Sequence, residues 1–217
     1  MTIDKDSYGT IAMVWGASLL AVLCLLSFVA PCVSLPLSSL LLVFMFFVLW
    51  FHRVPRRKIP EGDGRLVTSV ADGKVVIVEK TFESEYLRRE CIQISVYMDF
   101  FDVHSNFWPM TGKVSYYKYH PGRYFLAFQP KASEKNEHSS TVLTNEHGGI
   151  LFKQIAGTFA RRIVCYSREG EEVRRGEQCG IIKFGSRIDI FLPLSADVKV
   201  KVGDRTRACE TVLAELA

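Results

Sequence analysis

Among the side chains that can do nucleophilic or acid–base chemistry, three are the main candidates in this sequence: the hydroxyl of Ser186, the imidazole of His104 and the carboxylate of Asp72. Each also has an ordinary structural explanation. A Gly-Ser step between two β-patterned segments is commonly a turn or a bulge, and an Asp-Gly pair is a turn by default. An isolated histidine is more often structural than catalytic, although its pKa suits acid–base work near neutral pH. Taken singly, none of the three residues decides between these interpretations.

Short motifs around these residues, taken together and in order, resemble the phosphatidylserine decarboxylase family. The short bacterial and archaeal members have a Gly-Ser-Arg processing site, which matches Phe184-Gly-Ser-Arg-Ile-Asp-Ile-Phe-Leu-Pro193. The other matches follow the family's order along residues 50–213, and they are Ser69-Val-Ala-Asp-Gly-Lys-Val75, Asp102-Val-His-Ser-Asn106, Pro109-Met-Thr-Gly112, Tyr119-His-Pro-Gly122, Lys131-Ala-Ser-Glu-Lys-Asn-Glu137 and Ile155-Ala-Gly-Thr-Phe-Ala-Arg-Arg-Ile163. No single motif is decisive, but their common order is a specific signal.

The resemblance implies a self-processing enzyme whose covalent pyruvoyl group is derived from Ser186. Gly185 has no Cβ to block its carbonyl, so the Ser186 hydroxyl can attack that carbonyl and convert the amide into an ester. Elimination and hydrolysis then release ammonia and leave a β chain of residues 1–185 and an α chain of residues 186–217. The pyruvoyl ketone forms a Schiff base with the amine of phosphatidylserine, and loss of CO₂ gives phosphatidylethanolamine.

The same resemblance implies roles for further residues. Asp72 orients His104, the acid–base group, by the logic of a catalytic triad. Longer members of the family carry a second histidine three positions after His104, where this sequence has Phe107. The base for self-cleavage therefore stays open. Four residues are candidates for binding the substrate headgroup or its phosphate, although a loop-backbone or solvated surface role explains them too: Asn136, Glu137, Arg161 and Arg162.

The N-terminal quarter of the chain differs from the rest. Residues 1–51 contain only three charged side chains, whereas the whole chain has 27 Lys and Arg against 23 Asp and Glu. Residues 11–30 and 35–51 are uncharged runs of about the length that a helix needs to cross a bilayer, with a tight turn expected at residues 31–34. We expect a helical membrane hairpin that spans twice or lies in one leaflet, with a cleaved signal peptide as the alternative. An ordinary soluble enzyme is excluded.

A basic cluster follows the second apolar run and consists of His52, Arg53, Arg56, Arg57 and Lys58. Such clusters mark the cytoplasmic side of a membrane and can hold anionic lipid headgroups. We therefore expect the catalytic domain on the cytoplasmic face of the cell (inner) membrane, with both termini cytoplasmic if the hairpin crosses twice. Residues 52–64, with their prolines and glycines, read as a linker to a catalytic domain at residues 65–217.

The residue pattern of the catalytic region predicts a mainly β (α+β) domain of the sandwich-barrel type. A weak repeat of Gly-acid turns, at residues 170–177 and 203–210, is typical of lipoyl-type carriers, but no lysine stands between the halves to carry a cofactor. One short helix is expected at residues 83–89 and an exposed polar loop at residues 129–140. Strands are expected from alternation and β-branched content at residues 66–69, 74–78, 92–98, 113–117, 150–155, 162–166, 180–184, 187–192 and 198–202.

No metal site is predicted, because His120, His138 and His147 have no ligand-like spacing and the six cysteines form no Cys-x-x-Cys pair. The mild charge balance gives no reason to expect nucleic acid. The expected partners are phosphatidylserine in the membrane and, between the two fragments, an α–β heterodimer. A higher oligomer stays open. Two other functions also stay open: an archaetidylserine decarboxylase, which does the same chemistry on an ether lipid, and a non-catalytic membrane-anchored binding module.

Overall fold

The structure is a computed structural model that describes residues 1–123, 136–157, 163–182 and 186–217. It divides into two compact units, residues 1–55 and residues 56–217. The first unit is a pair of helices, and the second is built from strands. The predicted fold class, a mainly β domain preceded by an N-terminal helical hairpin, is therefore confirmed.

The N-terminal unit is a hairpin of two apolar helices, each long and apolar enough to cross a membrane. Its elements are β1 (Thr2–Ile3), the 3₁₀ helix η1 (Lys5–Ser7), α1 (Tyr8–Phe28), α2 (Pro31–Phe51) and β2 (Arg53–Val54). The indole Nε1 of Trp15 on α1 donates a hydrogen bond to the carbonyl of Met45 on α2, 3.2 Å away. Pairing of β1 with β2 closes the open end of the hairpin.

The turn of the hairpin lies earlier than residues 31–34, where the sequence predicted it. The helix α2 already begins at Pro31, and the reversal occurs at residues 29–30. Proline is favourable in the first helical position, because its missing N–H has no partner there and its ring presets φ. The charge pattern therefore located both helices, but the proline was a helix start rather than part of a turn.

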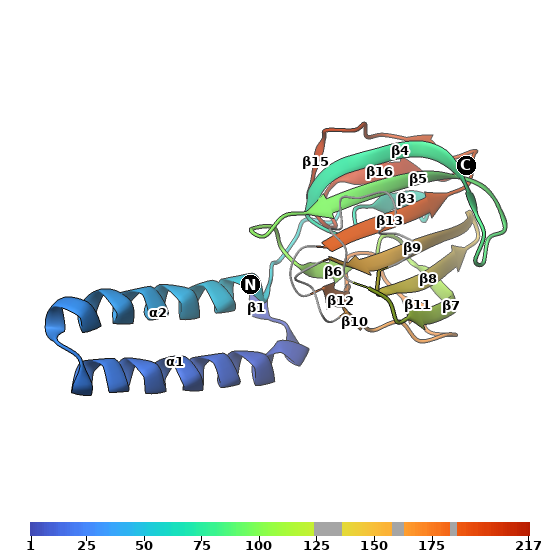
Figure 1. The fold of residues 1–217 in the computed structure, drawn as a ribbon. Helices are drawn as coiled ribbons and strands as arrows, with labels where there is room; N and C mark the ends of the chain where they lie inside the picture. Colours follow the sequence, from blue (N-terminus) through green and yellow to red (C-terminus); the bar gives the residue numbers. More distant parts are fainter. Residues whose placement is uncertain (124–135, 158–162, 183–185) are drawn as a thin grey trace. The chain divides into compact units, whose positions relative to one another are not determined.

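The second unit is organised around one antiparallel sheet of eight strands that curls into a half-barrel (Figure 1). In spatial order the strands are β11 (Glu172–Val173), β7 (Gly112–His120), β8 (His138–Asn145), β9 (Gly148–Ala156), β13 (Ser186–Leu192), β5 (Arg89–Met98), β4 (Gly73–Glu83) and β15 (Arg205–Thr206). Because β13 pairs with β9 on one side and β5 on the other, it lies in the interior of this sheet.

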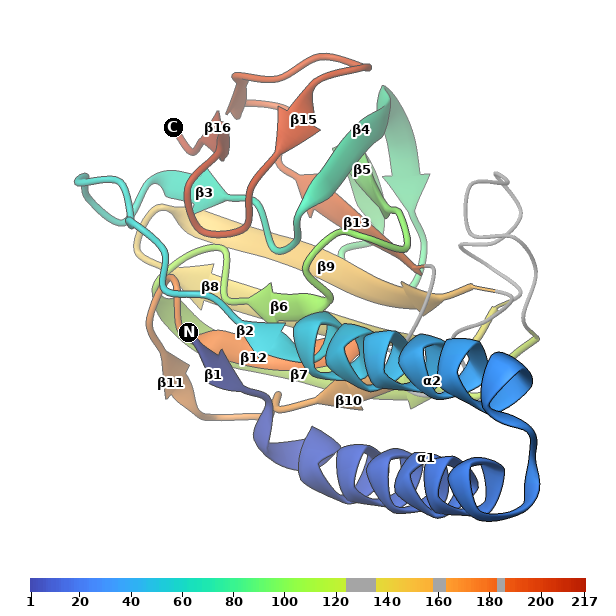
Figure 2. The same cartoon turned by 90° about the vertical axis from the view of Figure 1, so that its left-hand side faces the viewer.

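Two three-stranded sheets complete the domain, and Figure 2 shows them around the larger sheet. Their strands are β10 (Ile163–Cys165), β12 (Gln178–Ile182) and β6 (Ser105–Phe107) in one, and β14 (Asp197–Val198), β16 (Val212–Glu215) and β3 (Leu66–Thr68) in the other. One hydrophobic core joins all three sheets, since Ile188 of β13, Ile182 of β12 and Leu213 of β16 belong to the same buried cluster.

Alternation along β13 separates two faces of the sheet. Ile188, Ile190 and Leu192 enter the core, so the residues between them lie on the outer face. There Arg187 and Asp189 form an ion pair, with Nε and Oδ1 2.8 Å apart, and both side chains are fully buried. The sequence predicted a half-buried strand, whereas the structure buries both faces. Ser186 shares the inner face with Ile188.

The short helix predicted at residues 83–89 is wrong, because this segment is the turn of the β4–β5 hairpin. The carboxylate of Glu83 accepts hydrogen bonds from the amides of Glu85, Tyr86 and Leu87 at 2.8–2.9 Å. An acidic side chain that satisfies successive amides is also the pattern at the start of a helix. The local sequence therefore indicated a helix, although the segment is a turn whose amides are capped by Glu83.

The exposed loop predicted at residues 129–140 is wrong at its C-terminal end. Residues 136–140 are buried, and β8 begins at His138; residues 129–135 lie outside the described part of the chain. Polar side chains can be buried here because they are paired: Ser139 Oγ donates to Gln154 Oε1 at 2.9 Å, and Ser140 Oγ donates to Glu85 Oε2 at 2.8 Å. At the other end of the domain, the strand expected at residues 198–202 is reduced to β14.

Candidate active site

Ser186, the predicted reactive serine, is the first residue of β13. It lies directly opposite Met98 at the end of β5 and Ala156 at the end of β9. Its side chain is fully buried, and its hydroxyl donates a hydrogen bond to the thioether of Met98, with Oγ and Sδ 3.1 Å apart. Gly185, the other half of the predicted cleavage site, lies outside the described residues. The structure therefore places a buried hydroxyl at one end of the central strands.

His104 lies just before β6 and is fully buried. Its Nδ1 is 3.0 Å from the carbonyl oxygen of Asp102. A carbonyl can only accept, so Nδ1 carries the proton, and the neutral ring then has its lone pair on Nε2. The His104 carbonyl accepts the amide of Ile182, the last residue described before Ser186. His104 is thus held against the strand that leads into the predicted cleavage site.

A chain of neutral polar side chains runs along the inner face of the sheet beside Ser186. Gln154 Nε2 donates to Asn106 Oδ1 at 2.8 Å, and Gln154 Oε1 accepts from Ser139. Asn106 Nδ2 approaches Met98 Sδ at 4.0 Å, so one sulfur contacts both Ser186 and the residue two positions after His104. Sequence reasoning missed this group. Asn106 did fall in a matched motif, but Gln154 could be found only from the register of β9.

Asn136 and Glu137 are buried beside the same end of the sheet. Asn136 Nδ2 donates to the carbonyl of Ala156 at 2.7 Å, and the Ala156 amide donates to the carbonyl of Glu137 at 2.9 Å. Ala156 is the register neighbour of Ser186. The predicted headgroup residues therefore contact the strand neighbour of the predicted reactive serine. Arg161 and Arg162, the other two candidates, lie outside the described residues.

Gly122 shows how tightly this corner is packed. A Cβ at that position would lie 2.4 Å from the Asn136 carbonyl carbon and from the Glu137 nitrogen. No side chain fits there unless the backbone moves. The glycine of the Tyr-His-Pro-Gly motif thus allows the chain after β7 to contact the Asn-Glu pair, and Arg123 accepts the Glu137 amide at 3.0 Å.

Asp72 makes different contacts from those expected. Its carboxylate forms an ion pair with Arg57 at 2.6 Å and accepts the Ala208 amide at 2.8 Å, while His104 Nδ1 is bonded to the Asp102 carbonyl. Asp72 does act on that region electrostatically. Burial raises the pKa of the Asp102 carboxyl, and the charges of Asp99 and Asp72 add to the shift. The orienting role of Asp72 toward His104 stays a prediction.

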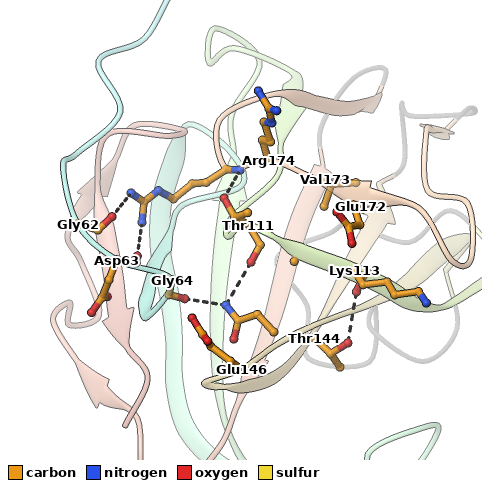
Figure 3. Close-up of a pocket in the computed structure, with 13 residues that line it drawn as sticks. Gly62, Asp63, Gly64, Thr111, Lys113, Thr144, Glu146, Glu172, Val173 and Arg174 are labelled. Carbon is orange, nitrogen blue, oxygen red and sulfur yellow. Dashed lines mark hydrogen bonds between the residues drawn. The ribbon is translucent and has the colours of Figure 1, made fainter.

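A separate surface cavity of about 780 Å³ lies at the opposite end of β7 and β8, and Figure 3 shows its lining. The Asn145 amide bridges the carbonyls of Gly64 and Thr111 at its wall. Its charged lining residues are of both signs: Asp63, Glu146 and Glu172 against Lys113, Arg174 and Arg175. It includes none of the residues predicted for chemistry, and the buried groups around Ser186 remain the stronger candidate site.

These residues together can support one kind of chemistry. A buried hydroxyl lies at a strand end, and a buried imidazole lies in the segment just before β6. The hydroxyl is fully buried against the Met98 thioether, and the same sulfur is approached by the amide of Asn106, a group that can stabilise a developing negative charge by hydrogen bonding. A hydroxyl and an imidazole are groups that nucleophilic and acid–base chemistry use.

Comparison with known proteins agrees with the motifs. The family model described as phosphatidylserine decarboxylase matches residues 44–214. The chain is 46% identical over 185 residues to the phosphatidylserine decarboxylase proenzyme of Amoebophilus asiaticus, covering 85% of this chain and 81% of that protein. It is 42% identical over 219 residues to that of Cytophaga hutchinsonii, covering 99% of each. It is 38% identical over 221 residues to that of Porphyromonas gingivalis, covering 100% and 99%.

The match spans the whole strand domain, including the Ser186 strand, the His104 segment and the Asn136–Glu137 corner. Relatives of this identity also cover nearly the full length of the chain. From its motifs, its fold and these relatives, the chain belongs to the phosphatidylserine decarboxylase family.

Proposed function

We propose that this chain is a self-processing, pyruvoyl-dependent phosphatidylserine decarboxylase that releases CO₂ and forms phosphatidylethanolamine. The observation that carries the proposal is the buried Ser186 hydroxyl at the first position of β13, in a chain whose relatives are named proenzymes. A self-processing proenzyme needs an internal nucleophile that can break its own backbone. Ser186 has the hydroxyl, and its neighbours supply the enclosed setting.

The residues around Ser186 fit a pyruvoyl group at that position. A pyruvoyl group is no larger than a serine residue. It would occupy the position of Ser186 between Met98 and Ala156 on the inner face. Nearby amide donors, on Asn106 and Gln154, suit a carbonyl oxygen. When present, the group supplies a ketone that condenses with a primary amine and accepts the electron pair left by departing CO₂.

His104 is the proposed proton acceptor during processing. Its Nε2 takes the Ser186 hydroxyl proton as Oγ bonds to the Gly185 carbonyl carbon, and the peptide nitrogen departs as the amine of residue 186. Elimination then leaves the Gly185 carboxylate and a dehydroalanine, whose hydrolysis consumes water and releases ammonia. In turnover the same Nε2 returns a proton to the substrate carbon after CO₂ has left.

The two proposed fragments remain one folded body. The α chain, residues 186–217, would contribute β13 to the interior of the eight-stranded sheet, while its neighbours β5 and β9 belong to the β chain of residues 1–185. Backbone hydrogen bonds on both edges of β13 and its core residues would hold the fragments together after cleavage. The headgroup is proposed to lie against Asn136 and Glu137, with Arg161 and Arg162 as the phosphate ligands.

The test of this function is a fragment analysis coupled to an activity assay. We expect the purified protein to give two chains on a denaturing gel, with the smaller beginning at residue 186 and blocked to Edman degradation. Detergent–phosphatidylserine micelles with a labelled serine carboxyl should release labelled CO₂ in step with the amount of the smaller chain. A free serine at position 186 of that fragment, found by mass spectrometry, would remove the pyruvoyl proposal.

The apolar hairpin is proposed to anchor the enzyme in the membrane with the strand domain on the cytoplasmic face. We expect the protein to stay in the membrane after washing with 1 M salt (on the order of a 3 Å Debye length), because salt screens the basic cluster but does not affect apolar burial. Deleting residues 1–51 should yield a protein that salt does extract and that turns over vesicle lipid poorly. Full extraction of the intact chain by salt would contradict the inserted hairpin.

A further inference from the structure

Three residues from separate parts of the chain converge on the outer face of the sheet. Glu85 lies in the β4–β5 turn, His120 is the last residue of β7 and His138 is the first residue of β8. His120 and His138 are directly paired across the two strands, and their rings stack with centroids 4.3 Å apart. One potential ligand atom from each of the three residues lies within 4.8 Å of the others.

His138 is prepared for metal binding by its hydrogen bond. Its Nδ1 donates to the carbonyl of Asn136 at 2.8 Å, which fixes the tautomer and leaves the Nε2 lone pair for a ligand. A backbone carbonyl behind the ring is the usual outer partner of a metal-binding histidine. Burial lowers the pKa of His138, and the neighbouring His120 adds to this effect.

The two carboxylate oxygens of Glu85 have different partners. One oxygen faces the histidines, and the other is held by Lys153 and Ser140. Its Oε2 accepts from Lys153 at 2.9 Å and from Ser140 at 2.8 Å. Its Oε1 accepts from His120 Nε2 at 2.7 Å and from the Tyr116 hydroxyl at 3.2 Å, and a bound ion would take the place of the His120 proton. Burial opposes ionisation of this carboxyl, but Lys153, Ser140 and His120 outweigh it and lower its pKa to about 2. Glu85 is thus held in place by the hydrogen bonds to its second oxygen.

We propose that Glu85, His120 and His138 bind a divalent transition-metal cation of the Zn²⁺ class. Two imidazole nitrogens and one carboxylate oxygen form a donor set that such ions bind, with a water molecule as the fourth ligand. Among the described residues, Lys153 contacts the other oxygen of Glu85 and also approaches Glu83 at 3.6 Å, so two carboxylates face this ammonium.

The proposed site is separate from the candidate active site but is linked to it through β8. Alternation along β8 puts His138 on the outer face and Ser139, which bonds Gln154, on the inner face. His138 directly follows Asn136 and Glu137, and its ring is tied to the Asn136 carbonyl. A bound ion would fasten the β4–β5 turn to β7 and β8, next to the Asn-Glu corner. The site depends on neither the pyruvoyl group nor the cleavage.

Zinc titration of the full-length protein in detergent, after removal of metal by EDTA and dialysis, tests the proposal. Isothermal calorimetry should show one Zn²⁺ site per chain that His120→Gln and His138→Gln each weaken by at least about tenfold, the usual minimum for loss of a supporting group. His147→Gln is the matched control, because His147 faces Glu146 at a distant turn. It should bind Zn²⁺ as wild type does.

Co²⁺ absorption gives a second readout that does not depend on stability or activity. The wild-type protein should show the visible d–d bands of a four-coordinate nitrogen–oxygen site, and His120→Gln should lose them. His120 is partly exposed, so this variant is expected to fold even if His138→Gln does not, and thermal unfolding in EDTA checks that. Absence of Zn²⁺ binding in wild type, or equal binding in wild type and folded His120→Gln, would overturn the site.

Discussion

Ser186→Ala is expected to leave one uncleaved chain of 24.6 kDa that releases no CO₂ above background. Alanine has no oxygen to attack the Gly185 carbonyl, so neither the ester nor the pyruvoyl group can form. The fold should survive, because within the described part of the chain the lost hydroxyl bonds a thioether sulfur, at the end of a strand with seven paired positions on one side. The loss of activity should therefore be complete and the loss of stability small.

Two companion variants make this result specific to the cleavage chemistry. Ser186→Thr keeps a hydroxyl but adds a methyl group at a fully buried position, and it should process slowly. Ser115→Ala removes a serine hydroxyl that bonds Thr144, away from β13, and should process at the wild-type rate. The measurement is a time course on a denaturing gel with parallel CO₂ release. Normal cleavage of the Ser186→Ala chain would eliminate Ser186 as the nucleophile.

His104→Gln is expected to slow both self-cleavage and CO₂ release by about 10²–10⁴-fold, the usual contribution of a positioned acid–base group. Glutamine keeps a polar side chain that can bond the Asp102 carbonyl, but it has no basic nitrogen near neutral pKa. Phe107, which stands where longer relatives have a second histidine, is a buried apolar residue and cannot take over the proton transfer. The single imidazole should therefore serve both steps.

The two rates separate the possible roles of His104. Normal cleavage with lost CO₂ release would confine His104 to decarboxylation, and another base would then be needed for processing. Wild-type rates in both assays would end its catalytic role. His147→Gln serves again as the control histidine. A bell-shaped or sigmoidal pH profile of cleavage that disappears in His104→Gln would distinguish proton transfer from a packing effect.

Local sequence was sufficient to locate the two apolar helices and the order of the motifs, and to single out Ser186 as the serine proposed to react. An uncharged run long enough to cross a bilayer can be identified without knowledge of tertiary contacts, because the free-energy cost of burying a charge in a bilayer applies to each residue separately. The alternation of β13 was equally plain, since side-chain direction has a period of two in any strand. The helix prediction at residues 83–89 was wrong because the local sequence was ambiguous there. A carboxylate that caps successive backbone amides occurs both in turns and at the start of helices.

Which side chains meet was decided only by the tertiary structure. The register of β13 against β5 and β9 brings Met98 and Ala156 to Ser186, although 88 residues separate Met98 from the serine. Likewise, pairing of β7 with β8 stacks His120 on His138, and the hairpin turn brings Glu85 to both. Asp72 matched a motif, yet its carboxylate pairs with Arg57. Sheet register depends on the packing of whole strands across a shared core, so residue spacing along the chain carries no record of these contacts.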